Sequence, residues 1–544
     1  MASLKQSLKK LRRRLFGFLR RRPRGTEHER TPAIRLDELL GDESLAPWWK
    51  KPLDLPALLA RHGISPRGVI HLGAHQGNEL DTYLALGCSP IVLVDANPAM
   101  IPVIRAKAAG RPGVHVVHAA ISDKEGPITL HITNAEQSSS ILPLGKHKAY
   151  YPKIREERAV VVPGKTIDGM LEELGLAAEQ FNLLVMDIQG AEFRALKGAA
   201  RTLPSIEAVL TEYSVVELYE GCALLGDLED FLAGSGLSRA SDCAPWHPTW
   251  GDAFYIRRPV VAMSTLGANG RFANQLFQYL FLATVARRND AIVQVPDWAG
   301  AHLYGLADPP PLRALPRFDE TDPTETTAAR IRAASAESLL ARNPDAVGVD
   351  YKGYFQFDSA ALAPLRADAR RLFTPIPAVA SRVQESIARL RGEGRRIVVV
   401  HLRRGDYGYD CFFRAPCAWY EEWIRRQSLD PARTVVYIAS EEPGTYRRRF
   451  DPLPTATARD ISTLPPALDW FVDFEVMRAA DSLAISNSSF SFMAAFLNER
   501  IARAARPCTD AMRLVDFDPA DAPVLLRKVV PSSLHQQLAA LDRR

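Results

Sequence analysis

The chain has 544 residues, which exceeds the usual size of one domain and predicts two or three folded units. Apolar residues make up 47% and charged residues 24%, a balance typical of folded globular proteins, and no run of about 18 apolar residues predicts a membrane-spanning helix. The formal net charge is +5, but residues 1–30 hold eleven Lys or Arg and two Glu, so the rest of the chain carries −4. This mildly acidic body argues against a nucleic-acid partner. The six cysteines are scattered, without a Cys-x-x-Cys pair or a cluster that suits zinc, and predict free thiols.

A short basic helix is predicted at the N-terminus. Its apolar side chains recur at steps of three and four and form one stripe: Leu4, Leu8, Leu11, Leu15 and Phe18. Lysines and arginines fill the other positions, a pattern that suits the surface of an anionic membrane. We interpret residues 1–30 as a basic amphipathic tail of a cytoplasmic protein, with residues 1–22 at the inner face of the membrane. A disordered tail, a nucleic-acid contact and a transit peptide stay open as alternatives.

Residues 50–258 are predicted to form an α/β domain. Short apolar runs alternate there with helical patterns, at Val69–Leu72, Ile91–Val94, Val114–Ala119, Leu183–Met186, Ala208–Leu210 and Ala253–Ile256. This alternation predicts a parallel sheet covered on both faces. Ligands of such sheets bind at the carboxyl ends of the strands, where this chain has glycine and polar residues: Gly73, Gly77, Asp95, Ser122, Asp123 and Asp187.

These strand-end residues favour a nucleoside ligand. Gly73 and Gly77 allow close backbone approach, and Asp95, about 20 residues later, can accept hydrogen bonds from both ribose hydroxyls. The loop lacks the Gly-x-Gly-x-x-Gly pattern that cradles a pyrophosphate. S-adenosylmethionine therefore fits better than NAD.

Four segments in this half resemble the FkbM-type methyltransferases in order and spacing. They are Val69–Asn78, Asp95–Pro98 with Asn97, Ala120–Asp123, and Met186–Glu192 followed by Leu196-Lys197-Gly198. The resemblance implies a Rossmann-like fold, S-adenosylmethionine as methyl donor and a hydroxyl, often on a sugar, as acceptor. It also implies that Gly73, Gly77, Asp95, Asn97, Ser122 and Asp123 hold the donor. His71 stands where many relatives have an acid.

Methyl transfer to an alcohol needs a group that removes the hydroxyl proton. Asp187 and Glu212 are our first candidates, with Glu192 or a nearby histidine as others. Glu192 has a simpler interpretation as an exposed acid in the first turn of a helix, where the helix dipole favours it.

Residues 259–535 are predicted to form a second domain. It begins with a strand at Val260–Met263 and a glycine-containing loop, Gly267–Gln275, that leads into an apolar helix from Leu276. Pro309–Pro323, rich in proline and charge, is predicted to be a surface excursion. A buried strand, Arg396–Val400, then delivers His401-Leu402-Arg403-Arg404-Gly405-Asp406-Tyr407 at its carboxyl end.

Two adjacent arginines after a buried strand need carboxylate partners or a bound polyanion. Because arginine binds phosphate with two parallel hydrogen bonds, Arg403 and Arg404 predict a clamp for the diphosphate of a nucleotide sugar. A plain pair of surface arginines is the alternative.

This half resembles the α-1,2-fucosyltransferases of glycosyltransferase family 11. The motif His-x-Arg-Arg-x-Asp lies at 401–406, and three further segments agree in order: Gly270–Tyr279, Lys352–Gln356, and Asp473–Met477 with Ile485–Phe492. The resemblance implies a GT-B fold, GDP-fucose as donor, inversion at the sugar and no required metal. It implies donor contacts for Asn274, Gln275, His401, Arg403, Arg404, Ser488 and Ser489, with Arg403 and Arg404 also offsetting charge on the departing diphosphate. Asp406 is our first candidate for the acceptor base, and an ion pair with the arginines is its alternative.

The two halves together suggest a bifunctional enzyme that fucosylates a glycan, either free or lipid-linked, and methylates a sugar hydroxyl, for which the added fucose is our first candidate. The hypothesis rests on the raised effective concentration that a tether gives a second site. Two independent activities on unrelated substrates, or one active half joined to a binding module, are the alternatives.

Overall fold

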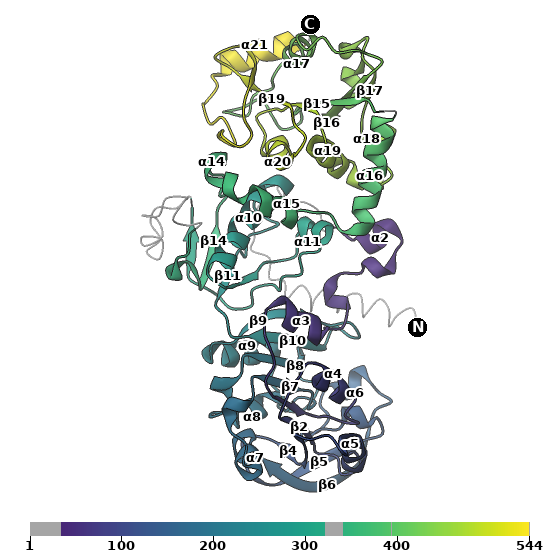
Figure 1. Cartoon of the computed structure of the whole chain (residues 1–544), viewed down its shortest axis with the longest axis vertical. Helices are drawn as coiled ribbons and strands as arrows, with labels where there is room; N and C mark the ends of the chain where they lie inside the picture. Colours follow the sequence, from purple (N-terminus) through teal and green to yellow (C-terminus); the bar gives the residue numbers. More distant parts are fainter. Residues whose placement is uncertain (1–33, 321–340, 393, 543–544) are drawn as a thin grey trace.

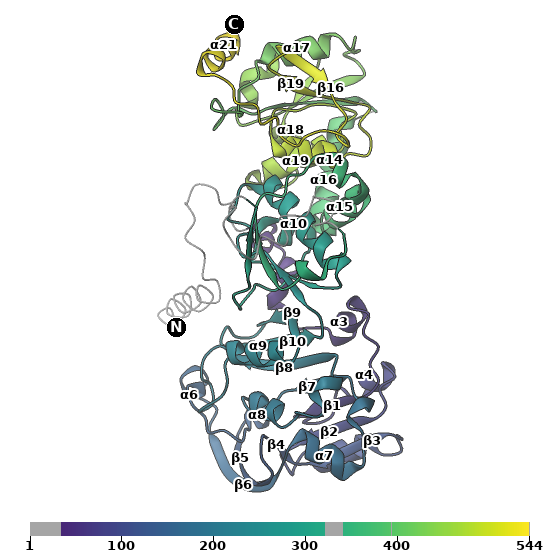
Figure 2. The same cartoon turned by 90° about the vertical axis from the view of Figure 1, so that its left-hand side faces the viewer.

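The computed structural model describes residues 34–320, 341–392 and 394–542. The predicted basic helix at residues 1–22 lies outside the described residues. The described chain forms three α/β units in a row, with the N-terminal half at one end and the last sheet at the other (Figures 1 and 2). It is an α/β protein with one seven-stranded sheet in the N-terminal half and two separate sheets in the C-terminal half, an arrangement that fits the expected Rossmann-like and two-sheet folds.

The N-terminal half is built on a seven-stranded sheet in the order β3-β2-β1-β7-β8-β10-β9. Its strands are β1 (Val69–Leu72), β2 (Ile91–Asp95), β3 (Val114–His118), β7 (Leu183–Met186), β8 (Ala208–Ser214), β9 (Ser238–Cys243) and β10 (Trp250–Ile256). The first five are parallel, whereas β10 runs antiparallel to both neighbours. The prediction of a wholly parallel sheet was therefore wrong at this edge. The short β9–β10 connection leaves no room for a crossover helix, and the polar sequence of β9 hides it from a hydrophobicity pattern.

Helices cover both faces of this sheet. The helices are α3 (Leu55–Arg61), α4 (Leu80–Ala85), α5 (Ile101–Ala108), α7 (Ile167–Leu174), α8 (Glu192–Lys197) and α9 (Leu225–Gly234). Two apolar cores result, one on each face. A separate three-stranded sheet, β4 (Ala120–Ile121), β6 (Glu156–Lys165) and β5 (Gly126–Thr133), extends beside the carboxyl edge, with α6 (His147–Tyr150) between its long strands.

The C-terminal half contains two sheets. The first has the order β12-β11-β14-β13, all parallel, with β11 (Val260–Ala262), β12 (Ile292–Gln294), β13 (Arg317–Asp319) and β14 (Val349–Lys352). Its helices are α10 (Phe272–Arg288) and α11 (Ala299–Tyr304). Pro309–Pro323 is more than a surface excursion, because it contributes the edge strand β13.

The second sheet has the order β17-β16-β15-β18-β19-β20. Its strands are β15 (Arg396–Leu402), β16 (Thr434–Ser440), β17 (Thr455–Ala456), β18 (Ser482–Ala484), β19 (Arg503–Cys508) and β20 (Arg513–Asp516), of which only β20 is antiparallel. The helices around it include α14 (Ser359–Leu362), α15 (Arg366–Leu372), α16 (Pro377–Arg391), α17 (Cys417–Arg425), α18 (Ala458–Ile461), α19 (Asp469–Arg478), α20 (Ser489–Leu497) and α21 (Ser532–Asp542). Helix α10 is apolar because α20 packs on it, so one core joins the two sheets.

The segment before the N-terminal half belongs to the C-terminal core. Leu36 of helix α2 (Leu36–Leu40), together with Ile34 just before the helix, is buried in the core that contains α10, α11 and α16. Trp48 and Trp49 each lie 5.8 Å from the ring of His302 on α11. The chain therefore crosses between the halves twice, once here and once between β10 and β11.

A buried arginine fastens the two halves where β9 meets β12. Arg239, 1% exposed, bonds to Glu229 at 2.9 Å and Asp242 at 2.5 Å, and donates to the Pro310 carbonyl at 2.7 Å. Gln294 of β12 donates to the Arg239 carbonyl at 3.1 Å. These bonds fix the edges of two neighbouring sheets against each other.

Candidate functional sites

A cavity of about 320 Å³ lies at the carboxyl ends of β1, β2 and β7. The predicted residues Gly73, Asp95, Asn97 and Asp187 all line it. This is the sheet edge at which parallel α/β proteins bind ligands. Its lining of backbone, one aspartate pair and small side chains fits the nucleoside of S-adenosylmethionine.

Asp95 is held rigidly at the rim of this cavity. One carboxylate oxygen accepts from the His75 backbone N–H and the other from the Asn97 backbone N–H, both at 2.7 Å. Burial raises the pKa of Asp95, and the two backbone N–H groups oppose that rise. Asn97 closes its turn by accepting from the Ala99 N–H at 3.0 Å. Each Asp95 oxygen keeps a second lone pair for a hydroxyl donor.

Gly73 is required by the backbone of the neighbouring strand. Its φ is +79°, and a Cβ atom there would lie 1.8 Å from the carbonyl oxygen of Asp187. Gly77 also has a positive φ of +66°, but a Cβ there would meet only side chains at ordinary contact distances, Ile104 at 3.6 Å and Leu93 at 3.8 Å. The first glycine therefore allows β1 and β7 to end side by side at the cavity.

Two non-glycine residues of the cavity adopt left-handed backbone conformations, His75 with φ 45° and Gln189 with φ 56°. Such strain is concentrated at functional sites. Gln189 uses it to join two acids, because its amide donates to Asp187 at 2.6 Å and to Glu212 at 2.8 Å. Tyr219 donates to the Gln189 side-chain oxygen at 2.6 Å and fixes the amide orientation.

The acids of this network influence one another. The pKa of Glu212 is raised far above its usual range by burial first, and then by the charges of Asp187, Glu192 and Asp252. Burial likewise raises the pKa of Asp187, whose carboxylate faces the open cavity but is surrounded by protein atoms. Asp252, on β10 directly opposite Glu212, has a pKa raised to about 6 by burial and by Asp187. Raised carboxyl pKa values suit proton acceptance near neutral pH.

Glu192 has a different role from either predicted one. It is 4% exposed, and its carboxylate accepts from the backbone N–H groups of Ile188 at 3.0 Å and Gly190 at 3.2 Å. It therefore holds the loop that carries Gln189 rather than facing solvent. His71 is buried and bonds to Tyr83 at 3.1 Å, and burial lowers its pKa to about 4, so it is neutral.

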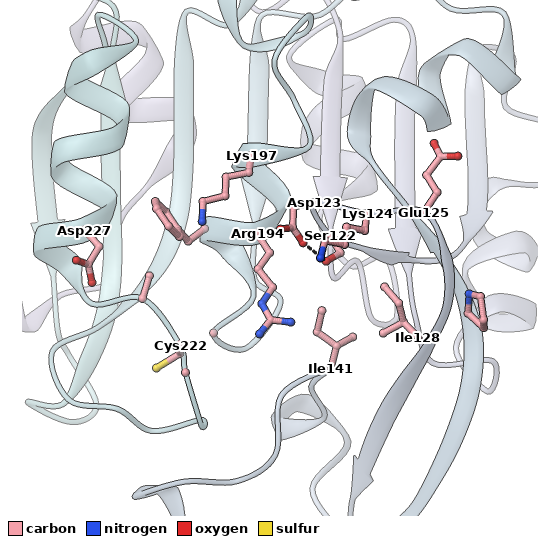
Figure 3. Close-up of a pocket in the computed structure, with 15 residues that line it drawn as sticks. Ser122, Asp123, Lys124, Glu125, Ile128, Ile141, Arg194, Lys197, Cys222 and Asp227 are labelled. Carbon is pink, nitrogen blue, oxygen red and sulfur yellow. Dashed lines mark hydrogen bonds between the residues drawn. The ribbon is translucent and has the colours of Figure 1, made fainter.

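Ser122 and Asp123 lie outside the cavity of Asp95. They line a neighbouring cavity of about 740 Å³, between the β5 side and helix α8 (Figure 3). The predicted donor contact of these two residues is therefore not supported by their placement. Ala120 and Ile121, immediately before them, are the residues that reach the cavity of Asp95.

In the C-terminal half, Arg403 and Asp406 follow β15 at the junction of the two sheets. Arg403 donates to Asp406 at 2.7 Å and forms an ion pair with Glu441, which follows β16. The second oxygen of Asp406 lies 3.1 Å from Arg271, which precedes α10 on the other sheet. Asp406 is thus shared by two arginines, an arrangement that favours the ion-pair alternative over a role as base.

Arg404 has protein partners and does not form a clamp with Arg403. Its side chain is buried and donates to Tyr446 at 2.9 Å and to the Ala415 carbonyl at 2.9 Å, with Asp542 of α21 at 3.3 Å. These groups are the partners that the buried Arg404 guanidinium needs and that could not be identified from the sequence. The predicted diphosphate contact is therefore reduced to Arg403.

The other predicted donor residues divide into two groups. Asn274 accepts from Ser489 at 2.6 Å and from Gln356 at 2.7 Å, so it joins α10 to the first residue of α20. Ser488 caps α20 by accepting from the Phe490 N–H at 3.3 Å. Asn274, Ser488 and Ser489 lie near Arg403. Tyr407, in the same loop as Arg403, donates to the carbonyl of Asn487, the residue before Ser488, at 2.9 Å.

His401 and Gln275 are buried behind this group. His401 bonds to Ser486 at 2.7 Å, and burial, with Arg403 and Arg404 next, lowers its pKa to about 3. Gln275 donates to the Gly270 carbonyl at 2.9 Å and so shapes the glycine-containing loop. Both residues support the site from beneath.

Three acids that the motifs did not single out complete this region: Glu441, Asp473 and Asp542. Asp473 accepts from Tyr437 at 2.6 Å, and burial, then Asp469 and Glu441, raises its pKa to about 8. Asp473 lies in a motif that was recognised as a block, whereas Glu441 and Asp542 carry no sequence signal. Among the described residues, no group of three or more His, Cys, Asp or Glu is arranged to hold a metal ion. Within the same residues, no helix has both the length and the apolarity to cross a bilayer.

Comparison with known proteins agrees with the N-terminal assignment. Residues 71–241 match the methyltransferase FkbM domain. The N-terminal half contains an FkbM methyltransferase domain. The 2-O-methyltransferase NoeI of Sinorhizobium fredii (strain NBRC 101917 / NGR234) is 28% identical over 172 residues, which is 30% of this chain and 70% of that protein.

Fucosyltransferases are among the solved structures that resemble part of this chain. NodZ alpha-1,6-fucosyltransferase soaked with GDP-fucose is 12% identical and matches over 48% of this chain and 99% of its own, with a TM-score of 0.34. A variant of Arabidopsis thaliana FUT1 in complex with GDP is 11% identical over 49% of this chain and 73% of its own, with a TM-score of 0.32. The assignment of this half rests on its own motifs and contacts.

Proposed function

We propose that this chain is a bifunctional glycan-modifying enzyme. Its C-terminal half transfers fucose from GDP-fucose to a glycan hydroxyl with inversion, forming an α-1,2 linkage. Its N-terminal half methylates a sugar hydroxyl, for which the added fucose is the first candidate. The placement of polar side chains at the ends of parallel strands carries the proposal. Asp95 and Asp187 line the cavity at the carboxyl ends of β1, β2 and β7, and Arg403 follows the carboxyl end of β15.

For methyl transfer, S-adenosylmethionine supplies an electrophilic methyl group when bound. Asp95 would hold the ribose hydroxyls, and Gly73 lets the backbone approach closely. The acceptor proton would pass to Asp187 or Glu212, which Gln189 holds as a pair. Alignment of the acceptor oxygen with the methyl group supplies much of the rate enhancement.

For fucosyl transfer, the charge of the departing diphosphate would be offset by Arg403, and the hydroxyls at the start of α20 would bind its oxygens. Asp406 and Glu441 keep the Arg403 guanidinium in place. We assign Asp406 a positioning role, because both of its oxygens are ion-paired.

The two activities can be separated with one variant each. Purified chain is incubated with a library of glycan acceptors and both donors, and mass spectrometry detects a deoxyhexose, a methyl group or both. Arg403→Ala should abolish the deoxyhexose gain and leave S-adenosylmethionine affinity unchanged. Asp95→Ala should abolish S-adenosylmethionine binding and leave the deoxyhexose gain unchanged. The α-1,2 linkage is checked by NMR of the product, and an α-1,6 product would refute that part of the proposal.

The same experiment distinguishes the alternatives. Methylation of acceptors that carry no fucose, at the rate of fucosylated ones, would refute sequential action and favour independent activities. Absence of one mass gain under all acceptors, with donor binding intact, would indicate that this half is a binding module.

We also propose that residues 1–22 contact an anionic membrane surface, on the basis of their sequence pattern alone. Cosedimentation with phosphatidylserine vesicles should be lost when residues 1–22 are removed. Equal cosedimentation of both chains would refute this proposal.

A further inference from the structure

The larger cavity of the N-terminal half, about 740 Å³, lies beside the candidate donor cavity. One wall comes from the segment Ser122–Glu125 and from Ile128 and Ile141, and the other from α8 and the loop around Cys222 (Figure 3). Ile141 lines both cavities, and Ser140 donates to the Gln189 carbonyl at 2.8 Å between them. A molecule bound here would therefore touch the loop that carries Gln189.

The acidic side chains of this cavity are used by neighbouring groups. Asp123 accepts from the Ser122 hydroxyl at 3.0 Å. Asp227 accepts from the Leu224 N–H at 2.8 Å as a cap of α9, and Glu125 accepts from Thr166 at 3.3 Å. These acids have local structural roles.

The basic side chains are not used in this way. Among residues 34–320, 341–392 and 394–542, Lys124 and Arg194 have no side-chain hydrogen bond or ion pair. Lys197 contacts only the Phe193 ring, at 4.1 Å from its centroid. Figure 3 shows the Arg194 side chain extending from α8 toward Ile141. The basic side chains thus keep their donors for a ligand, whereas each acid keeps its charge but already accepts a hydrogen bond from a neighbouring group.

We infer that this cavity binds an anionic saccharide, with Arg194 and Lys197 contacting a carboxylate or phosphate group. Arginine presents paired N–H donors to either group. Ile128, Ile141 and Phe193 offer apolar surface to the sugar ring. The inference rests on the proposed sugar methylation, and it assigns the acceptor of that reaction to acidic glycans.

The test compares saccharides that differ only in charge. Isothermal titration in S-adenosylhomocysteine measures binding of a glucuronate-terminated trisaccharide, its 6-phosphorylated glucose counterpart and the neutral glucose form. We expect at least tenfold tighter binding of one or both anionic forms. The two anionic arms identify whether the anion is a carboxylate or a phosphate.

The variant Arg194→Ala/Lys197→Ala should remove that tenfold preference. Both side chains are exposed, so the fold should be retained, and unchanged S-adenosylmethionine affinity verifies this. The matched control is Arg105→Ala on α5, an exposed arginine outside both cavities, which should leave the preference intact.

Equal affinity for charged and neutral saccharides, or an unchanged preference in the double variant, would overturn the inference and leave the proposed methylation standing. If the preference is present and lost in the double variant, but no acceptor is methylated, the inference stands and the proposed methylation fails.

Discussion

Arg506 of β19 is a buried arginine without a carboxylate partner among the described residues. Its Nη1 donates to the Pro523 carbonyl at 2.7 Å, but Nε and Nη2 have no partner in the same part of the chain. Its guanidinium lies over the rings of Phe492 and Phe517, at 5.9 and 5.3 Å. Burial lowers its pKa to about 10, which reflects the cost of keeping this charge away from water.

Arg239 is also buried, but it is paired with Glu229 and Asp242. Substitution of the two arginines should therefore change the free energy of unfolding in opposite directions. Arg506→Met should raise the free energy of unfolding, by about 1 kcal/mol or more, because it removes an uncompensated buried charge. Arg239→Met should lower it by about 3–5 kcal/mol, because Glu229 would lose its buried partner. Urea titration of both variants measures the two effects. A comparable loss in both would show that the Phe492 and Phe517 contacts outweigh the desolvation of Arg506.

Gly73 and Gly77 provide a matched pair of glycines. Both have positive φ, so alanine strains the backbone at either position, by about 1 kcal/mol. Only Gly73→Ala also places a Cβ against the Asp187 carbonyl. We expect a larger fall in Tm and a loss of S-adenosylmethionine affinity for Gly73→Ala alone, measured by differential scanning calorimetry and titration. Equal effects of the two substitutions would contradict this.

The charge of Asp252 should influence the pH at which methyl-transfer activity falls on the acid side of its profile. A catalytic carboxylate must be deprotonated, so activity falls as pH falls through its pKa. Asp252→Asn removes one negative charge that raises the pKa of Glu212, and that pKa should therefore decrease. The acid limb of kcat/KM should move to lower pH, while Asp81→Asn, an exposed acid on α4, should leave it unmoved. An unmoved limb in Asp252→Asn would exclude Glu212 as the base.

The residues at strand ends were predictable because a parallel sheet brings its carboxyl ends together. Gly73, Asp95 and Asp187 share one cavity for this reason. Arg404 shows the limit, because its partner Asp542 lies 138 residues away and no local pattern links them. Ser122 and Asp123 line the neighbouring cavity instead, since the direction of a side chain beyond a strand depends on the tertiary contacts of its loop.

At the scale of elements, helix α2 is part of the C-terminal core despite its position before the N-terminal half. A chain that lacks residues 1–46 should have a free energy of unfolding of the C-terminal half roughly 3–6 kcal/mol lower, because it loses two buried side chains, Ile34 and Leu36. Its S-adenosylmethionine affinity should be kept, since all seven strands of the first sheet remain. Chain lacking only residues 1–33 is the reference. Identical melting of the two truncated chains would refute this role of α2.

Two strands that the sequence analysis did not predict, β9 and β13, share a physical cause. β9 is short and polar, and β13 follows a proline-rich stretch, so neither has the apolar alternation of a strand. Both are edge strands, with one hydrogen-bonded neighbour each, and tertiary contacts at the junction of the halves stabilise β9. Patterns in sequence predict central strands because burial on both faces demands apolar residues.

At the scale of the whole molecule, the two candidate sites lie on different units. The sheet β12-β11-β14-β13 stands between the N-terminal half and the second sheet of the C-terminal half (Figures 1 and 2). Under the proposed function, a fucosylated product would therefore leave its site before a methyl group is added.

This arrangement predicts that two half-active chains can complement each other. An equal mixture of Arg403→Ala and Asp95→Ala chains should yield doubly modified glycan at a rate within a few-fold of the unmodified chain. Mass spectrometry of the time course measures it. A doubly modified product that forms only when both sites share one chain would contradict release of the intermediate.

The membership of α2 in the C-terminal core also sets an order of events during synthesis. His302 on α11, which contacts Trp48 in the segment that follows α2, leaves the ribosome about 250 residues after Trp48, which at ~5–20 residues per second is a delay of roughly 10–50 s. All strands of the first sheet emerge in that interval, so the methyltransferase half can fold while Leu36 is still exposed. The glycosyltransferase half closes last, around a helix that was made first.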